Sequence, residues 1–213
     1  MQLRIQSLLL RKSLFVLIPL LPFFAVEAKA IEQAKYEVIE KDENFELRQY
    51  APRIVAETFV TGDFKEVGNV GFRRLFDYIN GNNIKNQNIA VTAPVTQEAE
   101  SEKIAMTAPV TQERSQDQWR ITFLMPAQYT LETLPKPLDP LVQLTEEPGH
   151  LMAAIRYSGT WSQKRFEKNK ALLQAAIAKR GLSPLGQPVW ARYDPPFMPW
   201  FLRRNEVLIR VQD

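Results

Sequence analysis

The 213-residue sequence contains no cysteine and only one histidine. Without cysteine the chain has no disulfides, no thiolate chemistry and no lipid-modified N-terminal cysteine, so its stability must come from an ordinary hydrophobic core. A Cys–His catalytic pair is excluded as well. GxSxG, HExxH, CxxC and phosphate-binding-loop motifs are absent, and the acidic residues form no recognisable catalytic pair. Signals for an enzyme are therefore weak.

The first thirty residues have the pattern of a secretory signal peptide. Basic residues in segment 4–12 precede an apolar run at 13–26, and "AKA" at 28–30 offers small residues to a signal peptidase. The run is short for a transmembrane helix, which needs roughly 20 apolar residues; an uncleaved membrane anchor is the alternative. The pattern predicts a periplasmic or secreted protein that begins at Ile31 and has no stable membrane span after cleavage.

The net charge of +3 comes from this leader. Four of the 27 basic residues and one of the 24 acidic residues lie in it, so residues 31–213 carry no formal net charge. A balanced charge gives no support for nucleic-acid binding. The length of residues 31–213 fits one domain, or two small halves that share a core.

The two halves of this domain have the same predicted order of elements. The first half predicts a hairpin over 36–50, a strand over 53–62 and a helix over 63–80 that ends at Gly81. The second half predicts strands over 140–147 and 150–159, a helix over 161–181, and strands over 187–193 and 205–211.

Aligned at an offset of 97 residues, the halves share several positions. The matched pairs are Ala56 with Ala153, Gly62 with Gly159, Phe64 with Trp161, Leu75 with Leu172 and Phe76 with Leu173. This pattern predicts an α+β fold made of duplicated strand–strand–helix–strand units related by a pseudo-twofold axis, with joined sheets and helices packed on them.

A ten-residue segment occurs twice, as "IAVTAPVTQE" at 89–98 and "IAMTAPVTQE" at 104–113. We expect an antiparallel hairpin between the copies, with the partners Val91–Val110, Ala93–Ala108 and Val95–Met106 on one face. Pro94 and Pro109 cannot donate to a strand ladder, so each indicates an edge or a bulge. Such a bulge either borders a site or forms a barrel corner.

Three segments carry a family resemblance: "LFDYINGNN" at 75–83, "KIAMTAPV" at 103–110 and "ARYDPPFMPWFLRRNEVLI" at 191–209. In this order they resemble the SOUL/haem-binding protein family, here as a bacterial, exported member, and the likeness extends over 36–211. The resemblance implies a distorted antiparallel β-barrel with two flanking helices and two related halves. That fold is similar to the effector-binding domains of bacterial drug-responsive regulators.

The resemblance also implies that haem, or metal-free porphyrin, binds in an apolar groove between the helix at 63–80 and the loop at 194–205. Aromatic and methionine side chains suit the porphyrin face, and a guanidinium suits a propionate. The candidate ligand-contacting residues are Phe72, Arg73, Phe76, Met106, Tyr193, Phe197, Met198, Trp200, Phe201, Arg203 and Arg204.

Other interpretations of the same residues stay open. The loop aromatics would alternatively plug one end of the barrel while the arginines pair with Glu206 or Asp194, and the helical stripe would be core. The helix departs from the family pattern, because Asn69 and Asp77 stand where basic groove residues are expected. Arg73 or Arg74 would replace them only by reaching the groove.

The sole histidine, His150, is a candidate axial haem ligand, because a proximal histidine is the commonest one. It lies at the start of a strand beside a glycine, where a polar surface role is the alternative. A groove that holds porphyrin by its face needs no strong axial ligand. The rival function is a hydrolase, or a general binder of small amphipathic ligands, that uses the same groove; the hydrolase rests on fold analogy alone.

Overall fold

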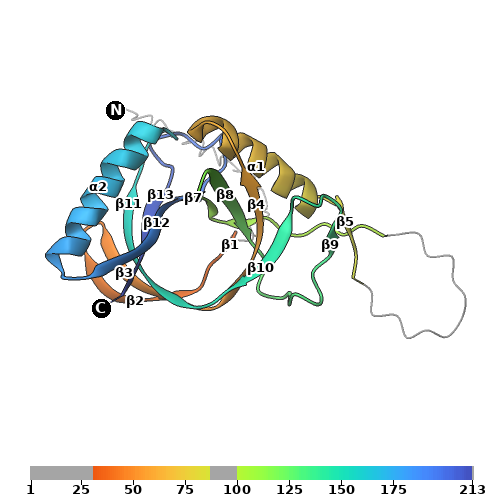
Figure 1. Cartoon of the computed structure of the whole chain (residues 1–213), viewed down its shortest axis with the longest axis horizontal. Helices are drawn as coiled ribbons and strands as arrows, with labels where there is room; N and C mark the ends of the chain where they lie inside the picture. The colour runs from red at the N-terminus through yellow and green to blue at the C-terminus, as the bar shows by residue number, and fades with distance from the viewer. Residues whose placement is uncertain (1–30, 87–99, 213) are drawn as a thin grey trace, which may run out of the picture. The chain divides into compact units, whose positions relative to one another are not determined.

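The computed structural model describes residues 31–86 and 100–212, which belong to one compact unit (Figure 1). Among these residues, no helix is long and apolar enough to cross a membrane. The described elements are β1 (Glu32–Gln33), β2 (Tyr36–Asp42), β3 (Phe45–Tyr50), β4 (Arg53–Val60), α1 (Phe64–Ile79), β5 (Asn83–Ile84), β6 (Thr107–Ala108), β7 (Val110–Ser115), β8 (Gln118–Leu124), β9 (Lys136–Pro137), β10 (Gln143–Glu147), β11 (His150–Tyr157), α2 (Gln163–Lys179), β12 (Ser183–Arg192) and β13 (Asn205–Gln212).

The main sheet is antiparallel and has the strand order β10-β4-β8-β7-β12-β13-β11-β3-β2. It curls strongly, as Figure 1 shows, and in the described part of the chain its edge strands β10 and β2 are not paired with each other. The predicted α+β class, with two helices against one antiparallel sheet, is confirmed.

The strand order is symmetric about the β7–β12 pair. One unit is β3-β4-α1-β7-β8 and the other is β10-β11-α2-β12-β13, so each has one strand more than the predicted strand–strand–helix–strand unit, although all four strands of the second unit were predicted individually. The first strand of each unit pairs with the second strand of the other: β10 lies beside β4, and β3 lies beside β11. This exchange joins the halves into one sheet and gives the chain its internal pseudo-symmetry.

The two helices cover the outer face of the curled sheet. α1 packs on β4 and β8, and α2 packs on β11, β12 and β13. Ala56 and Ala153, the strand positions matched at an offset of 97, are both fully buried. In the helices that offset is wrong by one residue, because Leu75 and Leu173 are the buried pair while Phe76 and Leu172 are 43% and 50% exposed.

Two glycines let α1 approach the sheet closely. A Cβ at Gly71 would lie 2.8 Å from the Ile121 Cβ on β8, and a Cβ at Gly68 would lie 2.8 Å from Gln112 Oε1 on β7. Both distances are shorter than side-chain carbon contacts allow, so helix and sheet would have to separate to accept alanine. The glycines lower the intrinsic stability of the helix, but they allow α1 to pack directly on the sheet.

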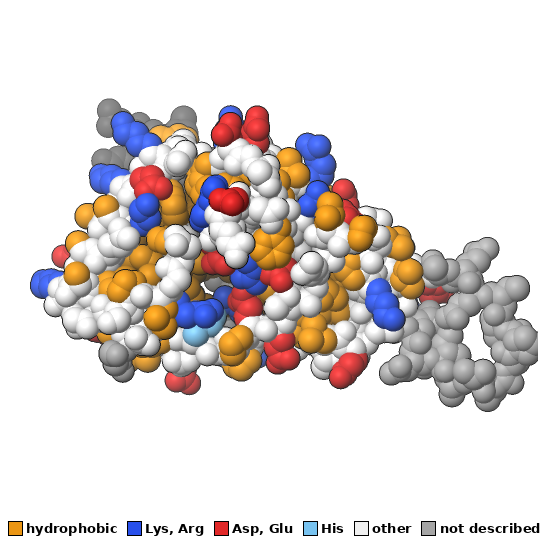
Figure 2. All heavy atoms as spheres, in the orientation of Figure 1, with side chains coloured by type: hydrophobic (Ala, Val, Ile, Leu, Met, Phe, Trp, Pro, Cys, Tyr) orange, Lys and Arg blue, Asp and Glu red, His pale blue; other side chains and the backbone are white. Residues whose placement is uncertain are grey.

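The inner face of the sheet carries charged side chains that are paired with one another. Arg48 lies against Glu206, and Arg120 forms ion pairs with Glu57 and Glu147. Figure 2 shows acidic and basic side chains gathered around a hollow in the middle of the molecule's face. The outer face is therefore the apolar side of the sheet, and the inner face is polar.

The strand neighbours of Val110, in the second copy of the repeated segment, differ from the hairpin partner that we predicted for it. The first copy, with Val91, Ala93, Pro94 and Val95, lies outside the described residues. Val110 pairs with Phe123 on one side and with Arg192 on the other, so both of its sheet neighbours are already present. Pro109 separates β6 from β7, which agrees with the predicted break in the ladder.

Candidate functional site

An apolar groove lies on the outer face between α1 and the loop that follows β12. Its cavity volume is about 430 Å³. α1 contributes Phe72 and Phe76, the segment around β6 contributes Met106, and the loop contributes the residues 193–196. The full lining is Ile31, Gly68, Asn69, Phe72, Phe76, Met106, Thr107, Ala108, Val110, Trp161, Arg192, Tyr193, Asp194, Pro195 and Pro196.

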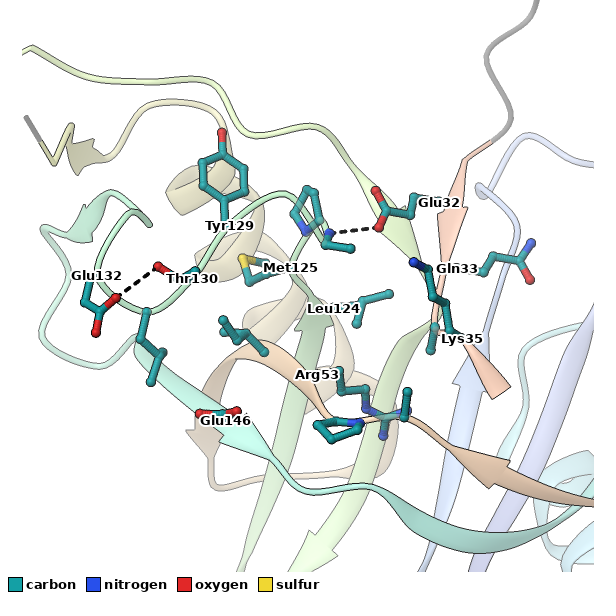
Figure 3. A pocket seen from close by; sticks show the side chains of 17 residues that line it. Glu32, Gln33, Lys35, Arg53, Leu124, Met125, Tyr129, Thr130, Glu132 and Glu146 are labelled. Carbon is teal, nitrogen blue, oxygen red and sulfur yellow. Dashed lines mark hydrogen bonds between the residues drawn. The ribbon is translucent and has the colours of Figure 1, made fainter. Parts of the chain in front are cut away.

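Two other cavities are more polar. The cavity in Figure 3, of about 400 Å³, lies beside β1 and has Lys35, Arg53, Glu132 and Glu146 around it. The cavity on the inner face of the sheet, of about 260 Å³, is lined by the ion-paired Arg120 and Glu147 and their neighbours. A large apolar ligand therefore fits the groove better than either of them.

Four of the predicted contact residues lie together in this groove: Phe72, Phe76, Met106 and Tyr193. The rings of Phe72 and Phe76 are stacked with their centroids 5.6 Å apart. Leu75 and Ile79 of the same helical stripe are buried in the core instead. One edge of the helical stripe therefore packs in the core, and the other edge lines the groove.

The aromatic residues of the loop do not plug the barrel. Phe197, Trp200 and Phe201 are 85%, 54% and 57% exposed, and Trp200 packs edge-on against Phe201. Their loop reaches the groove through its first residues, Asp194 to Pro196, so these aromatics lie beyond the groove wall. Together with Met198 they form an apolar rim, a name used below for Phe197, Met198, Trp200 and Phe201.

Arg203 and Arg204 hold the loop in place. Arg203 donates from Nε to the Met198 carbonyl (2.7 Å) and from Nη2 to the Pro196 carbonyl (2.5 Å). Arg204 forms an ion pair with Glu206 (2.8 Å) and its backbone N–H donates to Asp194, as the alternative interpretation of the sequence expected. Of the helix arginines, Arg73 is exposed and lies outside the groove lining.

Glu206 is the centre of a buried network on the inner face of the sheet, and this network holds Tyr193, which also lines the groove. It is fully buried and accepts hydrogen bonds from Arg48 (2.7 and 3.0 Å), from Arg204 and from the Tyr193 hydroxyl (2.7 Å). Burial alone would raise the pKa of Glu206, but the hydrogen bonds and charges of Arg48 and Arg204 lower it below its ordinary value. The network therefore holds a carboxylate in its charged form beneath Tyr193.

Eleven of the fifteen lining residues were not among the predicted contacts, and they include Gly68, Trp161 and Arg192. Strand alternation could have predicted Arg192, because it lies two residues after Trp190 and therefore on the same face of β12, and Trp190 is buried in the core under α2. The signal for Gly68 was its position inside a helical pattern, where a glycine indicates close approach of another segment.

His150 lies on the other face of the sheet from the groove. It lines the inner cavity with Met152, its Nδ1 lies 2.8 Å from the Pro148 carbonyl, and its ring is stacked near Tyr50. Burial, opposed by the Pro148 hydrogen bond, lowers its pKa. Among the described residues, no group of three or more His, Cys, Asp or Glu side chains is placed to hold a metal ion.

Comparison with known proteins gives the family and the fold. Residues 31–210 match the SOUL heme-binding protein family, and the chain belongs to it. Heme-binding protein 1 of Xenopus laevis is 25% identical over 164 residues, which cover 76% of this chain and 81% of the relative. Heme-binding protein 1 of Xenopus tropicalis is also 25% identical, over 167 residues, with the same coverage of both chains.

Solved structures with the same fold have little sequence identity to this chain. The EcmrR C-terminal domain is 9% identical with a TM-score of 0.55, over 84% of this chain and 98% of that domain. A hydrolase from Listeria innocua is 14% identical with a TM-score of 0.54, over 82% and 94%. Likeness at this level of identity concerns the fold alone.

Proposed function

We propose that this protein binds haem, or a metal-free porphyrin, non-covalently in the groove between α1 and the loop after β12. Two observations support this: the chain belongs to the SOUL heme-binding protein family, and its groove is the apolar one of the cavities described above. A porphyrin is a flat, apolar disc, and stacked aromatic side chains suit its faces. The observation that carries the proposal is the stacked pair Phe72–Phe76, which stays partly exposed in the groove wall.

The residues divide into two sets: those that line the groove and those of the apolar rim beyond it. Phe72, Phe76 and Met106 form the walls that would contact the faces of the ring. Tyr193 borders the groove, but its ring packs against Arg204 and its hydroxyl donates to Glu206. The apolar rim then covers the edge that points outward, and Arg203 keeps the rim in place through its backbone contacts. Of these lining residues, Met106 and Tyr193 have side chains that can bind haem iron, but methionine alone is a weak ligand and the Tyr193 hydroxyl already donates to Glu206. The groove accordingly holds the ring by its faces.

The direct test is titration of the purified protein with hemin and with metal-free protoporphyrin. We expect saturable one-to-one binding of both, seen as a Soret shift for hemin and as quenched tryptophan fluorescence for the metal-free ring. The rival hydrolase predicts turnover of a short-chain model ester without saturable binding of either ring. That result would remove the proposed function.

Substitution of His150 by alanine is expected to change hemin affinity less than about threefold, because His150 lies on the inner face of the sheet. Absorption titration of hemin measures this, and metal-free protoporphyrin serves as the matched ligand without iron. Loss of the Soret shift in the variant, with unchanged binding of the metal-free ring, would mean that His150 ligates the iron and that the groove is the wrong site.

We further propose that the protein is exported and that cleavage after Ala30 leaves Ile31 as its first residue. The support is the leader pattern described above, together with the family match that begins at Ile31. We expect the intact mass of the protein from an envelope or culture fraction to correspond to residues 31–213. A cytoplasmic protein with the mass of the full chain would contradict this.

A further inference from the structure

Arg192 is a charged residue on a strand face that otherwise belongs to the core. Two residues earlier on β12, Trp190 is 3% exposed and packs under α2. Arg192 comes from the same face at the end of the strand, where it lines the groove together with Trp161. Its guanidinium carbon lies 5.0 Å from the ring centroid of Trp190 and 5.4 Å from that of Trp161.

This guanidinium has no anionic partner in the part of the chain that the structure describes. Within residues 31–86 and 100–212, nothing accepts a hydrogen bond from its buried Nε and Nη2, and no carboxylate forms an ion pair with it. Arg48, Arg120 and Arg204 differ, because each has a carboxylate. Asp194 also lines the groove, but its Oδ2 accepts the Arg204 backbone N–H (2.5 Å).

The buried side chain nevertheless keeps its charge at neutral pH. Burial lowers the pKa of Arg192 to about 10, which still leaves the guanidinium protonated at pH 7. The faces of two indole rings stabilise a cation only partly. A buried charge without a counter-charge is unfavourable for the folded protein, and a ligand carboxylate in the groove would remove that cost.

The packing around Arg192 leaves the approach from the groove open. Gly68 of α1 passes directly over it: a Cβ at this position would lie 3.6 Å from Nη2 and 3.7 Å from Nη1. Any larger side chain at Gly68 would therefore cover the guanidinium. Glycine at this point of the helix keeps the cation within reach of a ligand in the groove.

We propose that Arg192 receives a carboxylate of the groove's ligand, so that the groove selects flat apolar compounds that carry a carboxylate and takes them with that group inward. A guanidinium binds a carboxylate through two parallel hydrogen bonds, which fixes direction as well as affinity. That the ligand is a porphyrin rests on the proposed function; the requirement for a carboxylate applies to any apolar ligand of this groove.

The test compares an acid with its ester. Wild-type protein is titrated with mesoporphyrin IX and with its dimethyl ester, and we expect the acid to bind about tenfold tighter or more. In Arg192→Met the affinity for the acid falls to that for the ester, while the affinity for the ester is unchanged. Arg73→Met, which removes an exposed arginine from α1, is the matched control and leaves the preference intact.

Equal affinity of acid and ester in the wild type would overturn the proposal, as would an acid preference that persists in Arg192→Met. If Arg192→Met does not fold, Arg192→Gln, which keeps a polar side chain, takes its place in the comparison. If neither porphyrin binds, the proposed function fails, and the proposal is tested with pyrenebutyrate against its methyl ester. If the protein prefers pyrenebutyrate to its ester and Arg192→Met loses this preference, Arg192 is the carboxylate site. If the wild type shows no preference, Arg192 does not bind a ligand carboxylate.

Discussion

Replacement of Glu206 by glutamine is expected to lower the free energy of unfolding by about 3–5 kcal/mol. Glu206 is fully buried between Arg48 and Arg204, and the substitution leaves Arg204 without a carboxylate and Arg48 with Glu46 alone. The cost is mainly that of the uncompensated charges that remain, rather than that of a lost contact. Urea unfolding followed by tryptophan fluorescence measures it.

Glu40→Gln is the matched control. Glu40 also pairs with an arginine, Arg180, but its side chain is 46% exposed. Surface ion pairs contribute about 1 kcal/mol or less, so this variant should unfold close to the wild-type urea concentration. If both variants lose the same small amount of stability, the Glu206 network is not what holds Tyr193.

The same carboxylate predicts a pH dependence of stability. The pKa of Glu206 is lowered in the folded protein from its ordinary value of 4.5. A lowered folded pKa means that the stabilisation is present above about pH 4.5 and is lost as the pH falls through the folded value. Between pH 6 and pH 3 the wild type should therefore lose more stability than Glu206→Gln, and parallel losses in the two proteins would contradict the assignment.

Replacement of Phe76 by aspartate is expected to weaken porphyrin binding by about a hundredfold or more. Burying an aromatic side chain against a ligand is worth about 1.5–3 kcal/mol, which corresponds to about one to two powers of ten in affinity. The new carboxylate adds a desolvation cost in an apolar groove and repels an acidic ligand. Because Phe76 is 43% exposed, the fold should tolerate the change.

Leu172→Asp places the same charge on the other helix. Leu172 is 50% exposed on α2 and lies outside the groove lining. We expect porphyrin affinity to stay within about threefold of the wild type, and the thermal unfolding midpoints of the two variants to be similar. Equal loss of binding in both variants would point to a general effect of the added charge on the protein. Retained binding in Phe76→Asp would show that the α1 side of the groove does not contact the porphyrin.

The sequence predicted those parts of the fold that local pattern determines. α1 begins after Asp63 and ends before Gly81, close to the helix expected from the spacing of Phe72, Leu75 and Ile79. The exchange of β3 and β10 between the halves was not predicted, because pairing between distant strands leaves no local signal. The strand β8 was missed too, although Ile121 and Phe123 alternate with polar residues along it.

The candidate site was predicted in part, for a similar reason. The groove-lining residues Phe72, Phe76 and Tyr193 followed from the family resemblance and the structure places them together. Arg204 belongs to a structural network instead, because Glu206 on the next strand lies within reach of its guanidinium. Gly68 and Gly71 interrupt the helical pattern of the sequence, and in the structure they are the positions where α1 meets the sheet.

The most direct test of the central claim is amide NMR of the protein during titration with metal-free protoporphyrin. Binding in the groove predicts saturable shifts at residues 68–76 of α1, at 106–110 and at 193–196, with little change around His150 and Arg120 on the inner face. Saturable shifts confined to the residues of the inner cavity, or no saturable shift at all, would contradict it.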